Sequence, residues 1–142
     1  MDVTFDRVRY MKKHRIRLAG PWESQFIGTD GQPDDEVIRC ELPFTLPESQ
    51  RESGVLLTRR FHRPTGIDDT TILRIVLQSS ESPVAVRLNG TDIAECRARP
   101  DAEFAFEITG QMAEFNLLGV LLRPAESAAP TTLNTAWLEI QE

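Results

Sequence analysis

The sequence predicts an all-β protein built as an antiparallel β-sandwich or barrel. Three observations support this fold class. Short runs alternate apolar and polar residues along most of the chain, prolines fall between these runs, and helical periodicity is almost absent. Strands that are not separated by helices pair antiparallel, either in two packed sheets or in a closed barrel.

The alternation predicts about eight or nine strands. The clearest runs are 37–42, 56–62, 72–77, 84–88, 104–106, 117–122 and 136–140. Apolar residues occupy both faces of 72–77, which is typical of a central strand, and 108–114 is compatible with a helical turn. The inward positions predict a core containing Ile38, Leu57, Phe61, Leu73, Ile75, Val86, Phe104, Leu118, Val120 and Leu138, and we expect Trp22 and Trp137 to close this core at its ends.

A β-hairpin is expected around Asn89-Gly90, which lies between two short alternating runs. Asn and Gly tolerate the two positive φ angles of a type I′ turn, so the turn explains both residues without any ligand. If the turn is their only role, Asn89→Asp should be nearly neutral, whereas Gly90→Val should cost about 1 kcal/mol or more.

Length and charge narrow the function classes. The 142 residues carry a net charge of −6, which suits one acidic globular domain and argues against nucleic acid or an anionic membrane as the partner. No apolar run approaches the length of a membrane span, and the charged start of the chain lacks the apolar core of a signal peptide, so we expect a cytoplasmic location. We expect residues 1–15 to be an extension or a first strand, and residues 16–142 to form one domain.

The sequence contains little that indicates a metal site, a disulfide or a cofactor. Cys40 and Cys96 are not spaced as metal ligands or as a disulfide framework, so we expect buried free thiols. No cofactor motif occurs. The acidic residues Asp30 and 34–36 are typical of a surface turn, although their oxygen atoms are also compatible with a structural calcium ion.

Six short motifs occur in an order that resembles a known domain. They are Leu18–Glu23, Leu42–Phe44, Thr58–Pro64, Val84–Gly90, Phe106–Thr109 and Phe115–Leu122. In this order they resemble the N-terminal sugar-binding domain of glycoside hydrolase family 2 enzymes, which include β-galactosidases, β-glucuronidases and β-mannosidases. The resemblance covers roughly residues 16–141. It implies a galactose-binding-like jelly roll of two antiparallel sheets, in which Asn89 reaches a sugar bound in the pocket of a neighbouring catalytic domain.

The chain departs from this family in ways that argue against catalysis. The loop 123–130 lacks the Asp that accompanies the sugar-contacting Asn in the family, and the catalytic barrel with its two glutamates does not follow. Glycoside hydrolysis needs two facing carboxylates, whereas Glu95, Glu103 and Glu107 are expected on solvated rims. His14 and His62 lie among charged strand residues and do not form a recognisable triad. We therefore predict no enzymatic activity and no catalytic residues.

Two functions remain after this elimination. The first is a non-catalytic carbohydrate-binding module, whose site would combine Asn89 with the polar side chains of a rim loop, Arg97, Arg99 and Asp101. The second is a protein-interaction or structural sandwich that has lost its sugar site. The expected partners are a carbohydrate or a carbohydrate-active enzyme subunit, and the oligomeric state is left open. A shortage of loop aromatics, with only Phe26 and Phe44 as candidates for stacking on a sugar, weakens the first function.

Overall fold

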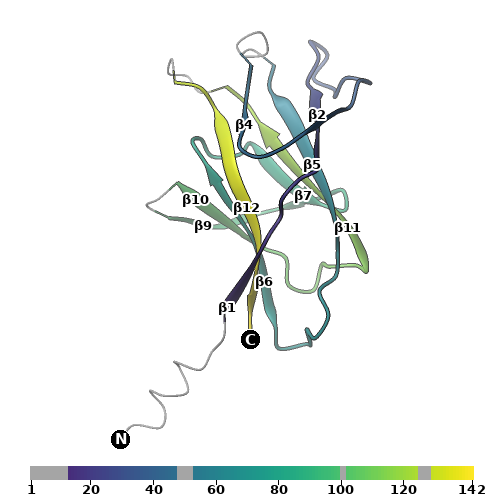
Figure 1. The fold of residues 1–142 in the computed structure, drawn as a ribbon, viewed down its shortest axis with the longest axis vertical. Coiled ribbons are helices and arrows are strands. Elements are labelled where there is room, and N and C mark those ends of the chain that lie inside the picture. Colours follow the sequence, from purple (N-terminus) through teal and green to yellow (C-terminus); the bar gives the residue numbers. More distant parts are fainter. Residues whose placement is uncertain (1–12, 48–52, 100–101, 125–128) are drawn as a thin grey trace, which may run out of the picture.

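Two antiparallel sheets packed face to face form the protein (Figure 1). The computed structural model describes residues 13–47, 53–99, 102–124 and 129–142, with only the backbone for 95–99. Each sheet contains six strands in this part of the chain. The predicted fold class, an all-β antiparallel sandwich, is confirmed.

Sheet A contains β1 (Lys13–Arg17), β12 (Thr132–Gln141), β6 (Ile72–Ser79), β10 (Glu103–Glu107) and β9 (Glu95–Arg99) in spatial order, with β4 (Phe44–Thr45) also paired to β12. Sheet B contains β3 (Ile38–Cys40), β2 (Trp22–Phe26), β5 (Val55–His62), β11 (Phe115–Leu122), β7 (Ala85–Leu88) and β8 (Thr91–Ile93). The described residues thus form more strands than the eight or nine predicted, because several elements are too short for their alternation to be recognised.

The core lies between the sheets and is built from the inward-facing positions of each strand. Eight of the ten predicted core residues are buried: Leu57, Phe61, Leu73, Ile75, Val86, Leu118, Val120 and Leu138. Phe104 is half-buried and packs against the core. The prediction for Ile38 is wrong, since this side chain is 40% exposed. Its strand, β3, has three residues and ends the sheet, so it has a neighbour on one side only.

The two tryptophans have different environments. Trp22 is fully buried, and its indole Nε1–H donates to the carbonyl of Leu18 at 2.9 Å, as predicted for a core residue. The same prediction is wrong for Trp137. Its neighbours Ala136 and Leu138 point into the core, so alternation turns Trp137 to the outer face of sheet A. There the guanidinium of Arg15 lies 5.0 Å from the ring centroid, a cation–π distance.

A buried carboxylate organises the outer face of sheet A. Glu139 on β12 is fully buried and accepts from Arg15 Nε at 3.0 Å and from Arg74 Nη1 at 3.3 Å. Arg15 also bonds Glu103, and these two partners, Glu103 above all, raise the pKa of its guanidinium. Lys13 Nζ lies 3.9 Å from Glu139. Ion pairs therefore connect the edge strand β1 to β12 and to β10, and connect β12 to β6.

The segment 108–114 is not a helix. The Gln111 N–H donates to the carbonyl of Ile108 at 2.9 Å, and Gly110 has a φ of 80°, so the chain turns here and then enters β11. Across the described residues no helix is long and apolar enough to cross a membrane.

The ion pairs of Glu139 should differ in their contribution to stability. Arg74→Met removes a cation that is 20% exposed and leaves the carboxylate buried, so we expect a loss of about 3 kcal/mol in the free energy of unfolding. Lys13→Met, at a side chain 49% exposed, should cost about 0.5 kcal/mol. Urea unfolding of both variants measures the difference. Equal losses would contradict this account of the network.

Candidate functional site

The turn between β7 and β8 has the predicted geometry. Leu88 pairs with Thr91, so Asn89 and Gly90 form a two-residue connection, and their φ angles are 54° and 85°. Positive φ at both central residues is the requirement of a type I′ turn. The hairpin prediction is therefore confirmed.

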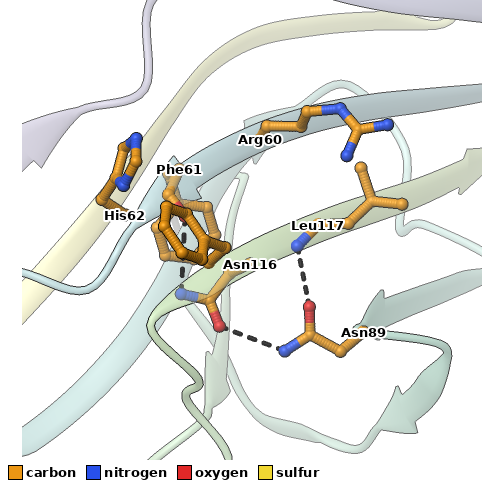
Figure 2. A pocket seen from close by; sticks show the side chains of 7 residues that line it. Arg60, Phe61, His62, Asn89, Asn116 and Leu117 are labelled. Atoms are coloured by element: carbon orange, nitrogen blue, oxygen red, sulfur yellow. Dashed lines mark hydrogen bonds between the residues drawn. The ribbon is translucent and has the colours of Figure 1, made fainter.

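The side chain of Asn89 holds this turn against strand β11 (Figure 2). Its Oδ1 accepts the N–H of Leu117 at 2.8 Å, and its Nδ2 donates to Oδ1 of Asn116 at 3.1 Å. The backbone N–H of Asn89 adds a bond to the carbonyl of Leu117 at 2.9 Å. One amide N–H of Asn89 makes no hydrogen bond to the described part of the chain. Most of the hydrogen-bonding capacity of this side chain is therefore used inside the protein.

Asn116 is the buried partner of this arrangement. Its Oδ1 accepts the N–H of Ala113 at 2.9 Å in addition to the Asn89 amide. Its Nδ2 donates to the carbonyl of Ala113 at 2.9 Å and to that of Phe61 at 3.5 Å. One buried amide thus joins the β7–β8 turn, the loop before β11 and strand β5, with all four hydrogen-bonding positions used.

A surface depression of about 480 Å³ lies beside the turn (Figure 2). This depression, the Phe115 hollow, is lined by Arg60, Phe61, His62, Asn89, Phe115, Asn116 and Leu117. Phe115 is 70% exposed, and the His62 ring meets it edge-on with the centroids 4.9 Å apart. The hollow therefore combines an exposed aromatic ring with a guanidinium, an imidazole and an amide.

The expected shortage of aromatics near a site is wrong at this position. The alternation of Phe115–Leu122 was sufficient to locate the ring, because Asn116, Leu118 and Val120 point inward and so turn Phe115 outward. The strand predicted from alternation covers 117–122, and the motif Phe115–Leu122 includes the ring without indicating its exposure.

A second depression of about 330 Å³ adjoins the first and shares Arg60 with it. This depression, the Arg39 hollow, is lined by Pro21, Glu23, Arg39, Thr58, Arg59 and Arg60. Arg59 Nε donates to the carbonyl of Ala19 at 2.5 Å, and burial lowers the pKa of this guanidinium. Three arginines therefore face one glutamate around the Arg39 hollow.

The predicted site residues are divided between the two sheets. Asn89 lines the Phe115 hollow on sheet B. Arg97 and Arg99 lie in β9, at the edge of sheet A, where their backbones pair with Ala105 and Glu103. Their side chains and Asp101 lie outside the described residues. A sugar contact by these three residues stays a prediction.

The structure gives no support to the calcium alternative. Oδ1 of Asp30 accepts the N–H of Gln32 at 3.0 Å, and the carbonyl of Asp34 accepts from Gln25 at 2.9 Å, as in an ordinary surface turn. No cluster of three or more metal-ligating side chains occurs within the described ranges. Cys40 is a half-buried free thiol whose pKa is raised by burial, and the side chain of Cys96 is outside the described residues.

The two hollows lack the carboxylate pair that glycoside hydrolysis requires. Among the described residues, no Asp or Glu lines the Phe115 hollow, and Glu23 is the one acid at the Arg39 hollow. A third depression carries Asp68 and Asp69, but hydrogen bonds from Thr70, and further bonds from Thr71, lower the pKa of Asp68. A general acid needs the opposite shift.

Comparison with solved structures identifies the fold. A β-glucuronidase from an uncultured Clostridium matches 91% of this chain with a TM-score of 0.68 and 16% identity. The β-glucuronidase of Bifidobacterium dentium, solved with coumarin-3-O-glucuronide, matches 93% with a TM-score of 0.67 and 14% identity. An FMN-binding β-glucuronidase from Faecalibacterium prausnitzii matches 91% with a TM-score of 0.69 and 15% identity.

The chain shares its fold with one part of the β-glucuronidases. The match covers 29%, 31% and 23% of the three enzyme chains, respectively. This confirms the predicted structural resemblance and is consistent with the sugar-binding domain of glycoside hydrolase family 2. No protein-family model and no curated protein sequence matches the chain.

The hydrogen bond between the two asparagines revises the expected effect of Asn89→Asp. An aspartate keeps the Leu117 bond but places an oxygen against Oδ1 of Asn116, which cannot rotate its amide without losing both Ala113 bonds. We therefore expect a loss of about 1–3 kcal/mol in the free energy of unfolding. Thermal and urea unfolding measure it. Asn134→Asp, at an exposed position of β12, controls for the added charge. Equal stability of the two variants would contradict this role of Asn116.

Proposed function

We propose that this chain is a non-catalytic carbohydrate-binding module and that the Phe115 hollow holds a sugar ring. The observation that carries the proposal is the exposed Phe115 ring, 70% accessible, at the rim of a hollow that also contains polar side chains. Single exposed apolar side chains are common on protein surfaces, so the argument depends on the hollow and on the polar side chains that lie beside this ring. The apolar face of a pyranose is a suitable partner for such a ring.

The polar groups of the hollow suit the hydroxyls of the same sugar. Arg60 supplies several N–H donors, His62 supplies ring nitrogens, and Asn89 retains one amide N–H. These groups come from β5 and from the β7–β8 turn, which are both hydrogen-bonded to β11, in part through the Asn116 side chain. A rigid arrangement lowers the ordering cost of binding a flexible hydroxylated ligand.

The proposal excludes catalysis for a chemical reason. The Phe115 hollow offers donors and an aromatic face, but no facing carboxylates on the described residues. The structural matches cover less than a third of each β-glucuronidase chain, so the similarity is to one part of those enzymes. The structural similarity over 91% or more of this chain also supports a galactose-binding-like jelly roll as the topology of the sandwich.

An interaction or structural domain is the second candidate. The observation that favours it is the internal use of Asn89, whose amide is largely occupied by Leu117 and Asn116. A domain that has lost its sugar site would retain these bonds for stability alone. Binding experiments on the isolated chain separate the two candidates.

Phe115 is the residue whose replacement tests sugar binding most cleanly. We expect titration calorimetry with galactose, mannose, glucuronate and their oligomers to identify at least one ligand, and Phe115→Ala to weaken it about tenfold or more by removing the stacking surface. The melting temperature should stay unchanged because the ring is exposed. Val84→Ala, at another exposed apolar residue, should leave the affinity unchanged. Absence of binding to every sugar would favour the second candidate.

Purified chain should not hydrolyse aryl glycosides above the buffer rate. The expectation follows from the absence of a carboxylate pair around the two described hollows. Release of 4-nitrophenol from the β-glucuronide, β-galactoside and β-mannoside measures it. Turnover that copurifies with the chain and is abolished by Glu103→Gln or Glu95→Gln would show that the module is an enzyme.

A further inference from the structure

The two hollows form one continuous surface on the outer face of sheet B. Arg60 lines both of them, and it follows Thr58 and precedes His62 on the outward side of β5. The neighbouring strands add Phe115 and Leu117 on one side and Glu23 on the other. In the strand register, Arg39 on β3 lies opposite Glu23 on β2, and it is the last residue of this row across the sheet.

The length of this surface follows from the strand register. His62 and Thr58 are four residues apart on β5, which corresponds to about 13 Å along the strand. Arg39 is two strands away from Thr58 through Glu23, which adds about 10 Å across the sheet. A single pyranose does not reach from Phe115 to Arg39, whereas a short chain of sugars does.

Two of the arginines on this surface have no ion-pair partner among the described residues. Arg60 and Arg39 are exposed, and neither makes an ion pair or a side-chain hydrogen bond to the described residues. On the same face, Arg87 is paired with Asp92 at 2.6 Å. On sheet A, Arg15 and Arg74 are paired with Glu139. Unpaired arginines in a chain of net charge −6 point to an external anion.

We propose that the ligand is an acidic oligosaccharide that lies across β5, from the Phe115 ring to Arg39, with Arg60 as the contact shared by both hollows. This inference rests on the proposed sugar-binding function and specifies its ligand class. The guanidinium fork binds carboxylates and sulfates through two parallel hydrogen bonds, which gives the arginines a geometric as well as an electrostatic role.

Glu23 determines where the acidic groups of the ligand lie on this surface. It lies between Arg39 and Thr58 in the register, on the Arg39 hollow, and it is half-buried. A carboxylate there disfavours an anionic group directly above it and accepts hydrogen bonds from sugar hydroxyls. The acidic groups of the ligand therefore lie over Arg60 and Arg39, with a hydroxyl-bearing part of the chain over Glu23.

The test compares matched ligands on the wild-type chain. The probes are tetragalacturonate, its methyl ester, which has the same backbone without charge, and monomeric galacturonate. A sulfated oligosaccharide of four units distinguishes sulfate from carboxylate as the acidic group. We expect titration calorimetry to show about tenfold or more tighter binding of the acidic tetramer than of its ester. We also expect the affinity to fall as salt is added.

Three arginine variants locate the ligand on the surface. Arg60→Gln should weaken both the monomer and the tetramer about tenfold, since Arg60 lines both hollows. Arg39→Gln should weaken the tetramer alone. Arg17→Gln, with the same change of charge on β1, should change neither. The melting temperature of each variant confirms that it is folded.

The outcomes separate this inference from the proposed function. Equal affinity for the tetramer and its ester, or no effect of Arg39→Gln, would overturn the acidic-oligosaccharide proposal while sugar binding stands. Failure of every sugar to bind would overturn both. Displacement of the tetramer by an acidic peptide such as tetra-glutamate, at equal or lower concentration, would show that the surface recognises acidic proteins and would also overturn the proposal.

Discussion

The hydrogen bonds of the buried Asn116 amide connect the segments that border the Phe115 hollow. Asn116 bonds Asn89 in the turn, Ala113 in the loop before β11, and Phe61 on β5. The side chains that line the Phe115 hollow come from this turn, from β5 and from β11 itself, which is also paired with β5 from Phe115 to Leu122. Because a buried amide must use its donors and acceptors, any shift of one segment would leave an unpaired polar group in the interior. The site is therefore held by a structural requirement of the core.

The need to satisfy the buried Asn116 amide also changes the interpretation of Asn89. The family resemblance assigns sugar contact to the asparagine of this motif, and the turn alone accounts for its positive φ. The structure adds a third role, because Asn89 is the surface half of an asparagine pair whose other half is buried. Asn89 has one amide N–H left to donate to a sugar. In the proposed binding, Phe115 and Arg60 therefore contribute more than Asn89 does.

The outer faces of the two sheets differ in whether their arginines are paired with carboxylates. On sheet A, Glu139 and Glu103 neutralise Arg15 and Arg74, and the guanidinium of Arg15 lies over Trp137. These charges stabilise the edge strand and are already paired. On sheet B, Arg39 and Arg60 are exposed to solvent, and Arg60 lies beside an exposed aromatic ring. The second face is therefore the one suited to a ligand.

Alternation along single strands predicted most of the core and the hairpin, because both depend on local periodicity and turn chemistry. Alternation failed at Ile38, which has the correct phase but lies on an edge strand with one neighbouring strand. At Trp137 the alternation itself was correct, since this residue has the phase opposite to Leu138, and the expectation of a core position disregarded it. The Glu139 network could not be predicted either, since its cations come from positions 65 or more residues away. Asn116 did leave a signal, as one polar residue at an inward position of an apolar strand.

Chemical-shift mapping of the isotopically labelled chain tests the central claim most directly. Titration with tetragalacturonate should move the amide resonances of Arg60, His62, Asn89, Phe115 and Leu117 together, since these residues border one hollow. The amides of Arg15, Trp137 and Glu139, on the outer face of sheet A, should stay in place. Shifts confined to sheet A, or to β9 and the loop that follows it, would place the ligand elsewhere and contradict the account.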